Sequence, residues 1–186
     1  MTMSNPKFLA VLALCALTFS CKEKEPQDNE GTKVEDQVEA TTKIEEQLII
    51  ELSMVVPKDD KFQILYRDLE GTFTPDRQIQ KRVEGSNQVQ KIQYVLDKYE
   101  YPSHLRLYFG MNPEQENLQF RGLILKYNDH IHEFTNDELN RYFVPSKGLG
   151  IDFENGKLEA EAVEGIYTPY LDSYNLSYFV NKLILN

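Results

Sequence analysis

Alternation of apolar and polar side chains over short segments is the feature that most restricts the fold of this 186-residue chain. In LIIELSMVV, residues 48–56, every second residue from Leu48 to Val56 is apolar, and Glu51 and Ser53 stand between them. Successive side chains of a strand point to opposite faces, so this period indicates a strand with one buried face. The segment is also rich in β-branched residues, which are typical of strands.

A helix is the alternative for this first segment. Thr42 and Glu45 have the spacing of a capping box, and Ile44, Leu48 and Leu52 recur every four residues as a helical stripe would. We favour the strand because the alternation runs through the whole segment.

Eight further segments have the composition of short strands. RQIQKRVEG is so polar that we expect it at an exposed edge, and the dipeptides Asn128-Asp129 and Asn155-Gly156 predict hairpins, the second with a two-residue type I′ turn. The segments are KFQILYR (61–67), RQIQKRVEG (77–85), VQKIQYVL (89–96), HLRLYFG (104–110), LQFRGLILKY (118–127), HIHEF (130–134), IDFE (151–154) and KLEA (157–160).

Two segments have helical spacing instead. TNDELNRYF offers Thr135 or Asn136 as an N-cap, and DSYNLSYFVNKLIL places apolar residues from Leu176 to Ile184 on one helical face. Eight or nine short strands with two short helices predict a mainly β fold, an antiparallel β-sandwich, in one domain over residues 47–186.

The N-terminal region has the pattern of an export signal. Lys7 precedes an apolar run from Phe8 to Phe19, and the small residue Ser20 ends it. A helix over this run would extend about 18 Å, whereas a bilayer core is about 30 Å thick. We therefore expect a signal peptide over residues 1–20.

Cys21 stands directly after the expected cleavage position, and the sequence around it resembles the lipobox of bacterial lipoproteins. Thr18 occupies the position where that family usually has leucine, and Leu17 lies one place earlier. The resemblance implies a diacylglyceryl group on the Cys21 thiol, cleavage before it, and anchoring in the outer membrane. The alternative is an ordinary signal peptide followed by an unmodified cysteine. Cys15 would be removed with the signal, so no disulfide is expected.

Residues 21–46 are expected to form an acidic, flexible tether. Residues 22–46 contain four lysines against nine acidic residues and no aromatic residue, a composition that cannot bury enough apolar surface to fold. Lys22, Glu23 and Glu25 resemble the charged tract that directs lipoproteins of the Bacteroidota to the cell surface. A periplasm-facing position is the alternative. The net charge of −10 argues against a nucleic-acid partner.

Residues 47–186 also resemble a module of exported and envelope proteins of the Bacteroidota. The segments that carry the resemblance are KFQILYRD, VEGSNQVQ, LRLYFG, LILKYND and VEGIYTPYL. It implies a jelly-roll-like sandwich and assigns no activity.

Two groups of side chains have the spacing of metal ligands. His130 and His132 would share one face of a strand, but zinc needs further ligands, which Asp129 or His104 would have to supply. Asp152, Glu154 and Asn155 carry the oxygen ligands that calcium prefers, but the sequence around them has no Asp-x-Asp-x-Asp loop. Solvated or half-exposed side chains are the simpler interpretation in both cases, and no metal or other cofactor is expected.

A tyrosine-rich segment is the candidate ligand-binding site. GIYTPYLDSYN brings Tyr167, Tyr170 and Tyr174 close together in what reads as a loop, and tyrosine rings can stack on sugars while their hydroxyls bond to ligand or water. The competing interpretation packs these rings into the end of the sandwich. We expect Tyr170 to be exposed and Tyr174 to lie buried under the last helix.

Catalytic motifs are not apparent. The chain has neither the G-x-S-x-G pattern of a nucleophile elbow nor H-E-x-x-H, and its pattern singles out no pair of carboxylates for glycoside hydrolysis. We therefore expect a membrane-anchored, non-catalytic β-sandwich that binds a glycan or an envelope component. An accessory subunit that binds another envelope protein is the alternative, and a hydrolase is a third.

Overall fold

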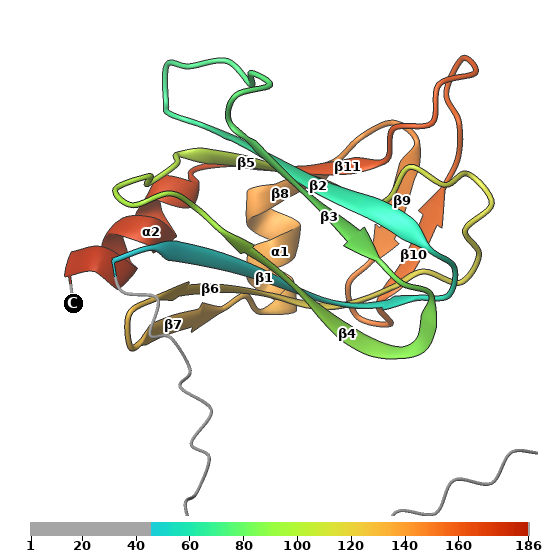
Figure 1. Ribbon diagram of the computed structural model, residues 1–186, viewed down its shortest axis with the longest axis horizontal. Coiled ribbons are helices and arrows are strands. Elements are labelled where there is room, and N and C mark those ends of the chain that lie inside the picture. Colours follow the sequence, from blue (N-terminus) through green and yellow to red (C-terminus); the bar gives the residue numbers. More distant parts are fainter. Residues whose placement is uncertain (1–45, 186) are drawn as a thin grey trace, which may run out of the picture. The chain divides into compact units, whose positions relative to one another are not determined.

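The computed structural model describes residues 46–185, and these residues form two antiparallel sheets packed face to face (Figure 1). Sheet A has the order β4 (Ser86–Val95), β1 (Leu48–Val56), β6 (Gln119–Tyr127), β10 (Lys157–Ala160) and β9 (Leu149–Asp152), and β7 (His130–Glu133) also pairs with β6. Sheet B has the order β3 (Gln78–Val83), β2 (Asp60–Arg67), β5 (His104–Tyr108), β11 (Tyr170–Ser173) and β8 (Phe143–Pro145). The predicted antiparallel β-sandwich is therefore confirmed.

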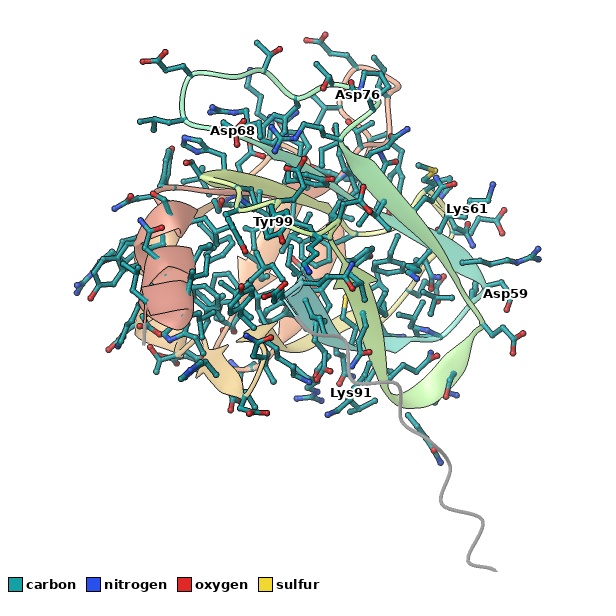
Figure 2. All side chains as sticks on the ribbon, turned by 60° about the vertical axis from the view of Figure 1, so that its left-hand side comes forward. Asp59, Lys61, Asp68, Asp76, Lys91 and Tyr99 are labelled. Carbon is teal, nitrogen blue, oxygen red and sulfur yellow. The ribbon has the colours of Figure 1, made fainter. Side chains whose placement is uncertain are left out.

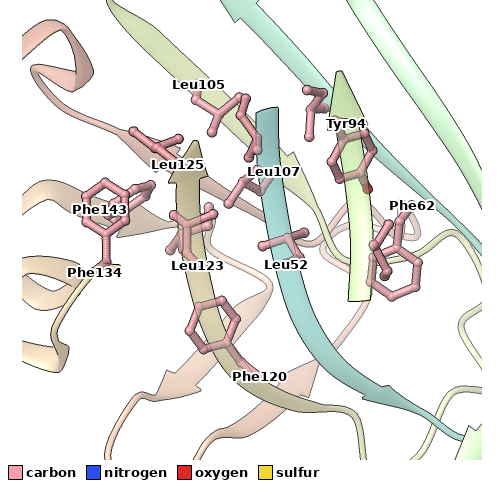
Figure 3. Packing of buried hydrophobic residues seen from close by; sticks show 14 of the residues in the cluster. Leu52, Phe62, Tyr94, Leu105, Leu107, Phe120, Leu123, Leu125, Phe134 and Phe143 are labelled. Atoms are coloured by element: carbon pink, nitrogen blue, oxygen red, sulfur yellow. The ribbon is translucent and has the colours of Figure 1, made fainter. Parts of the chain in front are cut away.

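The core lies between the inner faces of the two sheets. Leu52 of β1, Tyr94 of β4 and Leu123 of β6 face Phe62 of β2 and Leu107 of β5, and all five are buried (Figure 3). The alternation seen in the sequence is the origin of this core, because each strand turns every second side chain toward the other sheet.

Two helices complete the domain. Helix α1 (Asn136–Tyr142) has Thr135 as its N-cap, one of the two residues that the sequence offers for this position. Thr135 and Glu138 form a capping box, in which each side chain accepts a hydrogen bond from the backbone N–H of the other residue. Helix α2 (Leu176–Leu185) buries Leu176, Phe179, Val180 and Leu183 at one end of the sandwich, against β5, β6 and β7 (Figure 1).

Several strand predictions are confirmed and others need correction. The segment LIIELSMVV is strand β1, not a helix, and the polar segment is the edge strand β3 of sheet B. The described residues contain eleven strands rather than eight or nine. The two additional strands, β8 and β11, are short, and their sequences show no visible alternation. They are defined by their pairing, since β11 pairs with β8 on one edge and with β5 on the other.

The hairpin at Asn155-Gly156 exists, but its predicted turn type is wrong. Asp152 pairs directly with Lys157, so four residues connect β9 and β10, and positive φ occurs at Gly156 (+69°) and not at Asn155. The Asn128-Asp129 connection does have two residues, since Tyr127 pairs with His130, and Asn128 has a φ of +51°.

The predicted signal peptide, the lipidation site Cys21 and the tether up to residue 45 lie outside the described residues. Among residues 46–185, neither helix is long and apolar enough to cross a bilayer.

Candidate binding face on the outer side of sheet B

The outer face of sheet B carries a regular arrangement of aromatic, amide and charged side chains. Strand register places Gln63 beside Tyr108 and Tyr108 beside Tyr170 in one row across β2, β5 and β11. The next row places Arg106 directly opposite Asp172. Directly opposed residues on one face of a sheet have Cβ atoms about 4.5–5.5 Å apart, so each row brings its side chains into contact.

Arg106 is the centre of this arrangement. Its Nε donates to Asp172 Oδ1 at 2.6 Å and its Nη2 donates to Asp172 Oδ2 at 2.7 Å, which is the two-point geometry that arginine makes with carboxylates. Its guanidinium carbon lies 4.1 Å from the centre of the Tyr170 ring and 4.6 Å from that of Phe73. The hydrogen bonds that Arg106 donates to Asp172 raise the pKa of Arg106, so its guanidinium stays charged.

A hollow of about 200 Å³ lies beside this ion pair. We name it the Tyr170 hollow. The β2–β3 loop bounds it on one side, and β8 with Tyr174, which follows β11, bounds it on the other. Its lining includes Arg67, Phe73, His104, Ser146, Tyr170, Asp172 and Tyr174. The surface therefore combines aromatic rings with a carboxylate, a hydroxyl and an imidazole.

The β2–β3 loop is held in place by two arginines. Arg67 Nη1 donates to the carbonyl oxygens of Asp68, Leu69 and Gly71 at 3.0–3.1 Å, and Arg77 pairs with Asp68 and with Glu100. Figure 2 shows Asp68 on this loop, which rises above sheet B. The loop is thereby fixed in the position that brings Phe73 over Arg106.

The tyrosine-rich segment is only partly the loop that its sequence suggests. Tyr170–Ser173 forms strand β11 inside sheet B, so the prediction of a loop at these residues is wrong. Tyr170 is half-buried under Arg106, while Tyr174 is 53% exposed, which reverses the expected exposure of the two rings. The reason is that β11 ends at Ser173, and Tyr174 follows it on the surface before α2 begins.

Tyr167 lies apart from the other two tyrosines and does not line the Tyr170 hollow. It is half-buried, and this burial, together with the negative charge of Asp60, raises the pKa of its hydroxyl. Of the three predicted ligand-binding residues, the structure thus brings Tyr170 and Tyr174 together.

The side chains that the sequence offers as metal ligands have other roles in residues 46–185. The His132 ring packs against the rings of Phe134 and Phe179, each with its centre 4.7 Å away, and burial lowers its pKa. Asp152 accepts hydrogen bonds from the backbone of Glu154 and Asn155 and from the Asn155 side chain, which closes its own turn. Within residues 46–185, no three His, Cys, Asp or Glu side chains are grouped closely enough to hold an ion.

Phe73, Arg106 and Asp172 are the site residues that sequence analysis did not identify. Arg106 and Tyr108 alternate in the sequence with the apolar residues Leu105, Leu107 and Phe109, which is a weak signal for an outer-face site. Their partners come from residues more than 30 positions away, so the pairing itself is invisible in the sequence. Neither a protein-family model, nor a curated protein, nor a solved structure matches this chain significantly.

Proposed function

We propose that this protein is a lipid-anchored, non-catalytic binding protein whose sandwich domain holds a glycan on the outer face of sheet B. The observation that carries the proposal is the Tyr170 hollow, where an exposed Tyr174 ring lies beside the polar groups of Asp172, His104 and Ser146. Lipidation of Cys21 would attach the chain to the outer membrane, with the cell surface as the expected side.

A sugar matches the mixed chemistry of this hollow. One face of a pyranose ring is lined by C–H groups that stack on an aromatic ring, and its hydroxyls need donors and acceptors around the rim. Tyr174 offers an exposed ring, whereas Tyr170 is covered by Arg106. Tyr174 is therefore the expected stacking residue, and Tyr170 contributes to the hollow mainly by holding Arg106.

The side chains that line the Tyr170 hollow support binding of a sugar rather than its hydrolysis. Glycoside hydrolysis commonly needs two carboxyl groups, one of them protonated to act as the acid. Of the carboxylates among residues 46–185, Asp172 lines the hollow, and it accepts two hydrogen bonds from Arg106. A carboxylate engaged in this way can orient a sugar hydroxyl but is a poor proton donor.

Tyr174→Ala provides the test, and Tyr178→Ala is its matched control. Both rings are exposed to a similar extent, 53% and 55%, but Tyr178 lies on α2 and does not line the hollow. The wild-type protein, purified from membranes in detergent, is first screened on a glycan array. Loss of Tyr174 should then weaken the best glycan about tenfold, as expected for one aromatic stacking contact.

Thermal melts separate binding from folding in the same variants. Both substitutions should leave stability within about 0.5 kcal/mol of wild type, because the rings are on the surface. An array without any bound glycan, or equal affinities of Tyr174→Ala and Tyr178→Ala, would contradict the proposal.

A further inference from the structure

The outer face of sheet B has a basic edge beyond the Tyr170 hollow. Lys61 of β2 and Arg82 of β3 are directly opposite one another in the strand register, and both are exposed. Like charges in this position repel and destabilise a sheet. Their juxtaposition therefore costs stability, and it places two positive charges side by side in a chain of net charge −10.

Neither charge is neutralised by an ion pair recorded for residues 46–185. Two carboxylates border the same edge. Asp60 is buried, and its oxygens accept from the backbone N–H groups of Lys61, Met111 and Asn112 and from the Gln115 side chain. Asp59 is exposed and accepts from the backbone of Gly85 (Figure 2).

A third cation lies at the other end of β2. Arg67 faces the same side as Lys61, and its hydrogen bonds go to neutral backbone carbonyls. Its guanidinium carbon lies 5.2 Å from the centre of the Phe73 ring, and no carboxylate among residues 46–185 forms an ion pair with it. Lys61 and Arg67 are six positions apart on the strand, which corresponds to about 20 Å. Gln63 and the Tyr108–Tyr170 pair lie between them on the same face.

The positions of these positive charges favour a ligand of negative charge. A chain of sugar rings that lies across the face would contact aromatic and amide groups in the middle and meet positive charge toward the edge of the sheet. Lysine offers a compact charge and arginine a planar set of donors, and both bind carboxylate and sulfate oxygens by charge-assisted hydrogen bonds.

From this arrangement we infer that the glycan is anionic, a polysaccharide bearing carboxylate or sulfate groups that Lys61 and Arg82 contact. The inference rests on the proposed glycan-binding function and adds the ligand's charge to it.

Two matched pairs of polymers test the inference on the wild-type protein. Polygalacturonate is compared with its fully methyl-esterified form, and dextran sulfate with dextran, so that each pair differs mainly in charge. The charged member of at least one pair should bind at least about tenfold more tightly, which corresponds to one charge-assisted hydrogen bond. The preference should weaken as salt rises, because salt screens exposed charges.

Two double variants then locate the contact. Lys61→Gln with Arg82→Gln should remove most of that preference, again about tenfold. Arg121→Gln with Lys157→Gln is the control, since it removes two exposed charges from β6 and β10 of sheet A and changes the net charge equally. The control should bind within about twofold of wild type, and thermal melts verify that both double variants fold.

The possible failures differ from one another. Equal binding of charged and uncharged polymers overturns the anionic inference but leaves the glycan proposal standing, whereas no binding to any glycan overturns both. Poly-L-glutamate that competes as well as the best polymer would indicate an acidic protein partner instead. If both double variants lost affinity for the charged polymer equally, the loss would come from the change in net charge alone. That result would also overturn the inference.

Discussion

Arg106 and Asp172 lie 66 residues apart in the chain, yet they are direct neighbours on β5 and β11 and share two hydrogen bonds of 2.6 and 2.7 Å. Both side chains are about three-quarters buried, with 24% and 29% exposed. The pair therefore joins two strands of sheet B, and its Asp172 member also lines the Tyr170 hollow.

A double-mutant cycle on Arg106→Ala and Asp172→Ala should give a coupling energy of about 1–3 kcal/mol in urea unfolding. The exposed ion pair of Lys98 and Glu46, in which each side chain is about half exposed, is the control and should give at most about 1 kcal/mol. Equal coupling in the two cycles would show that the buried two-point geometry adds nothing.

Glu51 should make the domain sensitive to acid. Its side chain is fully buried on the outer side of sheet A, and this burial disfavours the charged form. Hydrogen bonds from Lys126, Gln93 and Lys91 outweigh that effect and lower its pKa to about 2. Because the folded-state pKa lies below the unfolded value of about 4.3, the stabilisation is present above that value and is lost as pH falls toward 2.

Urea midpoints measured at pH 7, 4 and 2.5 test the role of Glu51. Glu51→Gln should be less stable than wild type at pH 7 and should lose less stability on acidification, whereas Glu133→Gln, at an exposed position on β7, should follow wild type. Parallel pH profiles for wild type and Glu51→Gln would argue against Glu51 as the acid-sensitive group.

Gly156→Ala and Gly122→Ala should have opposite outcomes although they make the same chemical change. Gly156 has a φ of +69°, and an added Cβ there would overlap the carbonyl oxygen of Phe120. An added Cβ at Gly122 of β6 meets no atom within 4 Å.

We expect Gly156→Ala to lose about 1–3 kcal/mol, because both the backbone conformation and the space are unfavourable. Gly122→Ala should be neutral or slightly stabilising, because alanine restricts the unfolded chain without strain in the strand. Thermal melts of the two variants measure the difference, and similar melting temperatures would contradict the steric argument.

Cys21→Ser should abolish lipidation and move the protein from the membrane fraction to the soluble fraction. Attached acyl chains contribute about 0.8 kcal/mol per buried CH₂ group, and stable attachment takes more than one chain. Intact-mass analysis of the protein from its native host gives the direct measurement, and Cys15→Ser, within the predicted signal, is the control. An unmodified Cys21 in the wild-type mass would rule out the anchor.

The sequence by itself determined the class of fold and most of its elements. Strand β1 and strand β5 were predictable because a strand imposes a two-residue period on any segment with one buried face, and that period is visible in Leu48–Val56 and in Leu105–Phe109. The N-terminus of α1 was predictable for a similar reason, since the capping box is formed by Thr135 and Glu138 within four residues.

Only the tertiary structure decided which outer-face residues meet. Strand β11 has four residues, too few for a clear period, and it is a strand because β5 and β8 pair with its two edges. That pairing half-buries Tyr170 against Arg106 and leaves Tyr174 on the surface. A separate pairing, of β2 with β3, brings Lys61 opposite Arg82. Periodicity is a local property that each segment carries alone, whereas register depends on the packing of segments that are distant in the chain. The contact of Arg106 with Asp172 depends on such a register, between β5 and β11.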